Sequence, residues 1–122
     1  MEALRLDLKE TAKENDNFRK VLFTGAFSQV VAMSLSDGED IGLEKHDVDQ
    51  FIYVVDGKGT ALLGGSEGEL DKGDAVCVPA GTWHNVINGG HEPMKLVTIY
   101  SPPAHPAGLV EEEKVAEAPA MA

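Results

Sequence analysis

Hydrophobic residues occur along this chain in short runs that are separated by turns rich in glycine. The runs at 20–24 and 28–35 are parted by Gly25-Ala26, and they predict two strands joined by a turn. Further strands are predicted at 41–46, 49–55, 60–63, 75–79, 83–87 and 94–100. Asp56-Gly57 is a typical hairpin dipeptide, so we expect a hairpin there. Such regular alternation of strand and turn favours an antiparallel barrel or sandwich.

The two ends of the chain have a different pattern. Residues 1–17 are polar and charged, which fits either a short strand or a loose turn of helix. The segment 101–108 is rich in proline and cannot continue a central strand, because proline lacks the backbone donor. Residues 109–122 are rich in Glu and Ala, which predicts a frayed helix or a disordered tail. We therefore expect an N-terminal extension at 1–17, a barrel at 18–100, and a Pro-rich segment with an acidic tail at 101–122.

Composition narrows the class of protein. A chain of 122 residues suits one domain, and 13 Gly with 6 Pro suit an all-β fold. The formal charge of −11 disfavours nucleic acid and membrane surfaces as partners and leaves small molecules or proteins. The single cysteine, Cys77, excludes an intramolecular disulfide, and its apolar neighbours predict a buried, inert thiol. No segment resembles a signal peptide or a membrane span, so we expect a cytoplasmic protein.

One group of polar side chains could carry chemistry. Glu44, His46 and Gln50 share one parity, so on an extended backbone all three project from the same face. His84 can join them if the sheet folds over, and four nitrogen and oxygen donors of this kind suit a first-row divalent cation. A solvated strand face, with His84 in an ordinary turn contact, would give the same parity. Parity alone favours the solvated face over the metal site.

The spacing of these residues resembles the two motifs of the cupin family. Gly38, Glu44, His46, Gln50 and Gly57 have the spacing of the first motif, and every defined position of the second is matched by Gly73, Pro79, Gly81, His84 and Asn88. The resemblance extends over about 18–100. It implies a single antiparallel β-barrel or jelly roll with a metal site. The chain looks most like small bacterial single-domain cupins labelled mannose-6-phosphate isomerase-like, a label that names a similarity and not an activity.

Two residues depart from the family's usual metal ligands, which are three His and one Glu. Glu44 replaces the first His, and Gln50 replaces the Glu. The resemblance therefore implies Glu44, His46, Gln50 and His84 as ligands of Fe, Mn, Ni or Zn, with Fe or Mn favoured because oxygen donors gain at the expense of imidazole. If Gln50 lies outside the coordination sphere, two His and one carboxylate remain. The alternative is a site that has lost its metal and kept a pocket for an organic ligand.

Two functions fit these residues. The first is a metal-dependent enzyme that isomerises or oxygenates a small polar metabolite. The second is a non-catalytic module that binds or senses a small ligand. No acid or base other than the four ligands is expected to face the interior, which disfavours the isomerase. His105 could fold across the barrel mouth, but a surface position is the default expectation.

The strand at 49–55 predicts how the barrel packs. Ile52 and Val54 continue the parity of Gln50 and should face the interior, whereas Phe51, Tyr53 and Val55 should face outward. An outward apolar stripe needs cover, from N-terminal strands or from a second subunit. The resemblance to cupins implies a homodimer.

Overall fold

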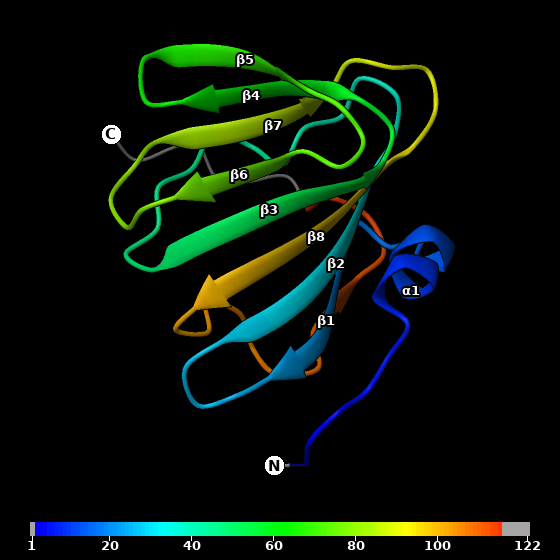
Figure 1. Cartoon of the computed structure of the whole chain (residues 1–122), viewed down its shortest axis with the longest axis vertical. Coiled ribbons are helices and arrows are strands. Elements are labelled where there is room, and N and C mark those ends of the chain that lie inside the picture. The colour runs from blue at the N-terminus through cyan, green and yellow to red at the C-terminus, as the bar shows by residue number, and fades with distance from the viewer. Residues whose placement is uncertain (1, 116–122) are drawn as a thin grey trace.

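Two antiparallel β-sheets lie over one another in the computed structural model, which describes residues 2–115 (Figure 1). The large sheet has the strand order β6-β3-β8-β2-β1-β9, and the small sheet has the order β5-β4-β7. In chain order the elements are α1 Leu8–Glu14, β1 Arg19–Thr24, β2 Gln29–Leu35, β3 Asp49–Asp56, β4 Gly59–Leu63, β5 Ser66–Leu70, β6 Ala75–Val78, β7 His84–Asn88, β8 Met94–Ser101 and β9 Val110–Glu111. The predicted all-β architecture is confirmed.

Apolar side chains from both sheets meet in one core between them. Ile52 and Val54 of β3 are fully buried there, as the alternation of the sequence predicts. They pack in the same cluster as Ala61 of β4, Leu70 of β5 and Val86 of β7. The inward positions of β3 therefore lead from this apolar core to the buried Gln50 at one end of the strand.

Helix α1 covers part of the outer face of the large sheet. The Asp7 carboxylate caps the helix by accepting a hydrogen bond from the Glu10 backbone N–H at 3.0 Å. Ala12 is completely buried against Val55 and Val97. Of the two structures predicted for the N-terminus, the helix is therefore the one that forms. Within the described residues no helix is long and apolar enough to cross a membrane.

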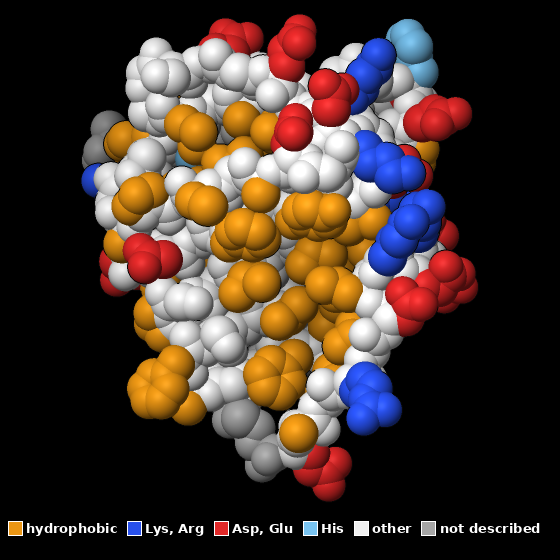
Figure 2. Space-filling model, viewed as in Figure 1, with side chains coloured by type: hydrophobic (Ala, Val, Ile, Leu, Met, Phe, Trp, Pro, Cys, Tyr) orange, Lys and Arg blue, Asp and Glu red, His pale blue; other side chains and the backbone are white. Residues whose placement is uncertain are grey.

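The rest of this outer face is apolar and open. Figure 2 shows hydrophobic side chains gathered on the face that is seen in Figure 1. Phe51 and Tyr53 belong to it, with 38% and 39% of their surfaces exposed. Cys77 is also exposed, so the predicted buried thiol is wrong. In β6 the inward positions belong to Val76 and Val78, and strand alternation turns Cys77 outward.

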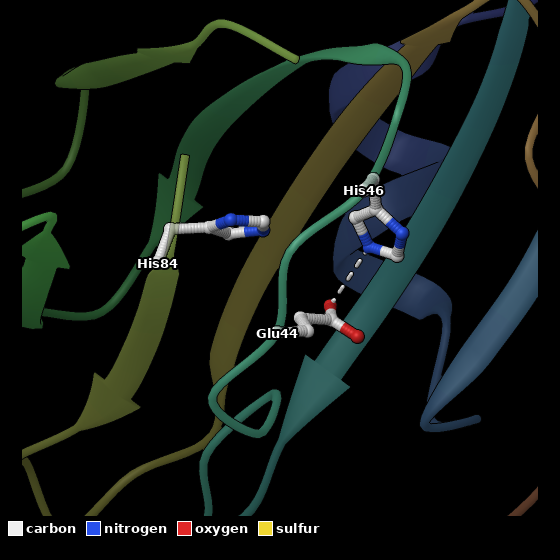
Figure 3. A group of neighbouring side chains, drawn as sticks. All are labelled: Glu44, His46 and His84. Carbon is white, nitrogen blue, oxygen red and sulfur yellow. Dashed lines mark ion pairs between the residues drawn. The ribbon is translucent and has the colours of Figure 1, made fainter. Parts of the chain in front are cut away.

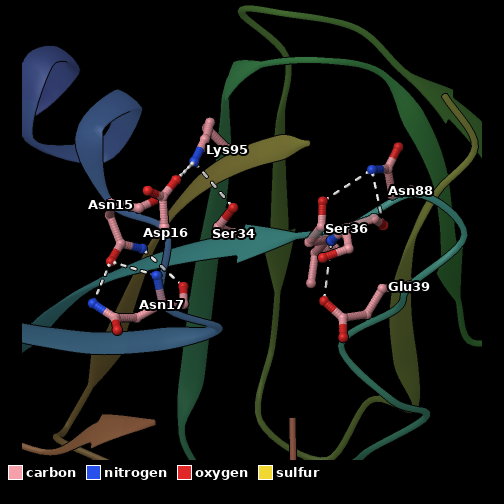
Figure 4. A network of polar contacts seen from close by, with 9 residues as sticks. Asn15, Asp16, Asn17, Ser34, Ser36, Glu39, Asn88 and Lys95 are labelled. Carbon is pink, nitrogen blue, oxygen red and sulfur yellow. Dashed lines mark hydrogen bonds and ion pairs between the residues drawn. The ribbon is translucent and has the colours of Figure 1, made fainter. Parts of the chain in front are cut away.

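Two buried polar side chains hold the connections in place (Figure 4). Lys95 of β8 donates to the Asn15 carbonyl at 2.5 Å and to the Ser34 hydroxyl at 3.1 Å, which ties the end of α1 to the large sheet. Asn88 donates through Nδ2 to the carbonyl oxygens of Leu35, Ser36 and Glu92, and its Oδ1 accepts from the Gly90 N–H. The motif asparagine therefore has a structural role.

Three sequence predictions fail locally. Residues 41–46 form no strand. Two isolated bridges join the segment 40–46 to β7, Asp40 with Ile87 and Glu44 with His84. Asp56-Gly57 is no hairpin, because β3 and β4 belong to different sheets and the turn connects them. Val110–Glu111 forms β9, which pairs with β1 in place of the predicted frayed helix or disordered tail. The predicted tail beyond residue 115 lies outside the described residues.

Candidate metal site

Backbone pairing brings Glu44 and His84 together. The Glu44 N–H donates to the His84 carbonyl at 3.0 Å, and the His84 N–H donates to the Glu44 carbonyl at 2.9 Å. Residues paired in this way project their side chains to the same face of the sheet. His46 is anchored two residues later, where its carbonyl accepts from the Gly81 N–H at 2.7 Å. The two motifs are distant in the sequence, and these backbone hydrogen bonds bring them into direct contact.

Glu44, His46 and His84 offer donor atoms that all lie within 4.8 Å of one another. The Nε2 atom of His46 is 3.3 Å from Oε1 of Glu44, and the ring centroids of the two histidines are 5.6 Å apart. Figure 3 shows the His84 ring extending from β7 toward the other two side chains. This arrangement can hold a metal ion between one carboxylate and two imidazoles.

A backbone contact fixes the tautomer of His84. Its Nδ1 lies 2.9 Å from the carbonyl oxygen of Thr82. Because a carbonyl oxygen can only accept, Nδ1 carries the proton, and Nε2 keeps a free lone pair. That Nε2 atom is buried and has no hydrogen-bond partner. Metal-binding histidines are commonly oriented by such a bond from the other ring nitrogen.

Gln50, the fourth predicted ligand, is buried on the inner face of β3. It faces the interior from β3 with 3% of its surface exposed, and neither Oε1 nor Nε2 has a hydrogen-bond partner. It is paired in register with Tyr100, whose ring packs edge-on against His46 with 5.8 Å between the centroids. An unpartnered amide in the interior fits a role as a fourth ligand or as a contact to a bound molecule. Coordination by Gln50 stays a prediction.

Further polar residues line the interior beside these side chains. Tyr100 is completely buried, and burial raises its pKa to about 12, with the Arg19 guanidinium opposing the rise and the Glu44 carboxylate adding to it. His105 packs edge-on against Tyr100, with 5.0 Å between ring centroids. Burial lowers the pKa of His105 to about 4, and the positive charge of Arg19 acts in the same direction. His105 is therefore neutral at pH 7.

These residues correct two expectations from the sequence. His105 is not a surface histidine, and the interior does contain groups able to exchange protons besides the predicted ligands. Strand parity could have identified Tyr100, which alternates with the outward Ile99 and shares the face of Leu96. It could also have identified Arg19, which shares the inward face of Val21. Nothing local predicts His105, because a distant side chain fixes its position.

The sequence between β2 and β8 matches a known family. The model of the Cupin_2 family, described as a cupin domain, matches residues 31–100. The chain belongs to the cupin family. The matched residues run from β2 to β8 and include all four predicted ligands. The finer resemblance to proteins labelled mannose-6-phosphate isomerase-like stays a prediction.

Several relatives share this cupin sequence. YrkC, an uncharacterized protein of Bacillus subtilis, is 47% identical over 116 residues, which cover 89% of this chain and 62% of YrkC. The uncharacterized protein L612 of Acanthamoeba polyphaga mimivirus is 39% identical, with 87% of this chain and 69% of L612 covered. This cupin chain thus spans about three fifths to two thirds of the length of these relatives.

Solved structures share the fold. The crystal structure of BH2720 from Bacillus halodurans superposes with a TM-score of 0.89 at 42% identity, covering 91% of this cupin and 89% of BH2720. The crystal structure of TT1209 from Thermus thermophilus gives a TM-score of 0.71 at 27% identity, covering 80% of this chain and 96% of TT1209. The agreement extends over most of both chains, and it shows the shared fold.

Proposed function

We propose that this cupin is a metal-dependent enzyme that acts on a small polar metabolite by isomerisation or oxygenation. The observation that carries the proposal is the convergence of Glu44, His46 and His84, whose donor atoms lie within 4.8 Å of one another. The Nε2 atom of His84 is buried and has no hydrogen-bond partner, and the buried Nε2 of His46 has only the Glu44 carboxylate nearby, at 3.3 Å, although buried polar atoms are nearly always well paired. A metal ion would satisfy both atoms.

The residues fit a divalent first-row ion, with Glu44, His46 and His84 as the ligands and Gln50 as a fourth. One carboxylate and two neutral imidazoles leave a bound divalent ion with a net positive charge, and mixed oxygen and nitrogen donors favour Fe or Mn. When bound, the metal supplies a Lewis acid and a template for a chelating substrate. The chain itself orients His84 through Thr82 and keeps water from the buried side of the site.

Two further residues support catalysis over mere binding. The Tyr100 ring packs against His46 with 5.8 Å between the centroids, and the His105 ring packs against Tyr100 with 5.0 Å between the centroids. A phenol and a neutral imidazole can hold or move a proton at a bound molecule. The alternative function, a module that binds or senses a small ligand without transforming it, would use the same interior.

Elemental analysis of the untagged protein, purified without chelator, tests the metal. We expect near-stoichiometric Fe or Mn in the wild type, and its loss in Glu44→Gln and His84→Ala. The matched controls are Glu67→Gln in the exposed strand β5 and His91→Ala, whose side chain is exposed in a turn. Both control variants should retain the metal.

Activity assays then separate the two functions. Oxygen uptake is measured first if the ion is Fe, and isomerisation of sugars first if it is Mn or Zn. Metal-dependent turnover that disappears in His84→Ala supports the enzyme. A folded protein that binds no added divalent ion would contradict the metalloenzyme. Metal-dependent binding of a small molecule without turnover would favour the binding module.

A further inference from the structure

Buried polar atoms without partners are concentrated in the barrel interior. Within the described residues they belong to six side chains, namely Arg19, His46, Gln50, His84, Thr98 and His105. Arg19 is paired in register with Met33 of the core, and Thr98 is paired with the inward Ile52, which places both on the inner face. Only two of these side chains belong to the metal triad. The others indicate that the interior binds something larger than an ion.

His105 is held in place by a fully buried glutamine. The Oε1 atom of Gln29 accepts hydrogen bonds from the N–H groups of Ala104 at 3.2 Å and His105 at 3.0 Å. Its Nε2 donates to the His105 carbonyl at 2.8 Å and to the Thr24 hydroxyl at 3.0 Å. Both donors and both acceptor positions of the amide are thereby used. This clamp fixes the backbone of His105 and so the place of its imidazole.

Gln29 belongs to a polar row that crosses the large sheet. Gln29 of β2, Tyr100 of β8 and Gln50 of β3 are direct neighbours in register, and at most 3% of any of them is exposed. The rings of His46 and His105 both pack edge-on against Tyr100. The metal triad and His105 are therefore separated by one aromatic side chain, a separation that a small molecule can span.

The charges on this side of the interior favour an anionic oxygen. The Arg19 guanidinium is 8% exposed and pairs with Glu111 through Nη1, while its Nε–H has no partner. The Nε2 atom of His105 is likewise buried without a partner. A divalent metal held by Glu44 keeps one positive charge after neutralisation. A molecule that is anionic at both ends would complement the metal and the unpaired donors together.

We propose that His105 and Arg19 bind the distal carboxylate of a small acid whose other end chelates the metal, and that Gln29 is the residue that positions His105. This inference rests on the proposed metal site. It assigns a substrate class, a small hydroxy or oxo acid with a second carboxylate, and it assigns the distal contact to two residues outside the matched residues 31–100.

Titration calorimetry of the Mn(II)-loaded protein with L-malate and L-lactate tests the assignment. The two acids share a hydroxy acid head, and only malate carries a distal carboxylate. We expect the wild type to bind malate at least tenfold more tightly than lactate. In His105→Ala the affinity for malate should fall about tenfold, since a hydrogen bond to a charged group is lost, while the affinities for lactate and Mn(II) stay unchanged.

Two further variants separate contact from positioning. His105→Gln retains an N–H donor and should recover part of the preference for malate. Gln29→Met removes the clamp at similar volume and should lose the preference while Mn(II) and lactate still bind. His91→Ala, at the exposed turn, should behave as the wild type.

The outcomes distinguish the two proposals. An equal ratio of malate to lactate affinity in wild type and His105→Ala would overturn the role of His105, and a Mn(II)-loaded wild type that binds neither acid would overturn the substrate class. Failure to bind Mn(II) at all would overturn the proposed function. Even then, the distal carboxylate contact would be supported if the metal-free protein still preferred malate and His105→Ala did not.

Discussion

Gly59 should tolerate no side chain, because the neighbouring strand approaches its α-carbon too closely. A β-carbon at this position would lie 2.1 Å from the Ile87 carbonyl oxygen and 3.0 Å from the Met94 sulfur. Gly59 is paired with Asn88 at the end of the β4–β7 ladder. To accommodate alanine, β7 must therefore move by about 1 Å from β4, because contacts shorter than 3.0 Å are essentially never seen.

The expected cost follows from this displacement. Overpacking of a well-packed site typically costs about 1–3 kcal/mol of stability. Replacing glycine by alanine also lowers the entropy of the unfolded chain, and this offsets about 0.5 kcal/mol of that cost. We expect Gly59→Ala to lower the free energy of unfolding by about 2 kcal/mol or more. The rigid obstacle is a backbone oxygen, so rotation of a side chain cannot relieve the contact.

Gly65→Ala is the matched control. A β-carbon there meets nothing within 4 Å, and the backbone needs no left-handed conformation. Urea denaturation of both variants measures the difference in the free energy of unfolding. Gly65→Ala should stay within about 0.5 kcal/mol of the wild type. If Gly59→Ala were as stable as Gly65→Ala, the close approach of β4 and β7 would be refuted.

Three further predictions concern stability, pH and assembly. Asn88→Ala should lower the free energy of unfolding by about 3 kcal/mol, because three carbonyl oxygens and one N–H lose their partner. Urea denaturation measures this, and a loss below about 1 kcal/mol would contradict it. Because the pKa of His105 falls from 6.5 in the unfolded chain to about 4 in the fold, its contribution to stability should decline as the pH drops from 6.5 to 4. His105→Gln should show a weaker decline in thermal denaturation, and an unchanged slope would argue against burial of the ring. The predicted homodimer should bury the open apolar face. Light scattering should therefore give twice the mass of one chain for the wild type and the mass of one chain for Phe51→Asp. A monomeric wild type would rule out the homodimer.

Strand alternation and motif spacing predicted much of the molecule. The inward positions of β3, the strands β1, β2, β7 and β8, and the family all followed from the sequence. The proximity of Glu44, His46 and His84 followed from the family spacing, since parity alone favoured a solvated strand face.

Other features depend on contacts between distant residues. Gly42 adopts a φ of +98°, which interrupts the strand predicted at 41–46. The short strand β9 forms because β1 offers a free edge to Val110, although the local sequence is acidic. The position of His105 depends on Gln29, 76 residues earlier, and no local pattern can encode such a pair.

The segment that carries Glu44 and His46 forms no continuous strand with the small sheet: two isolated bridges join it to β7, and the His46 carbonyl accepts from the Gly81 N–H. A segment at the edge of a sheet, outside a continuous ladder, opens locally more often than the whole domain unfolds. One such opening would withdraw two ligands at once and leave His84 behind on β7. The lifetime of a bound ion would then depend on the rate at which this segment opens as much as on the strength of the coordination bonds. Amide exchange at 40–46 and metal dissociation should therefore share one rate-limiting motion.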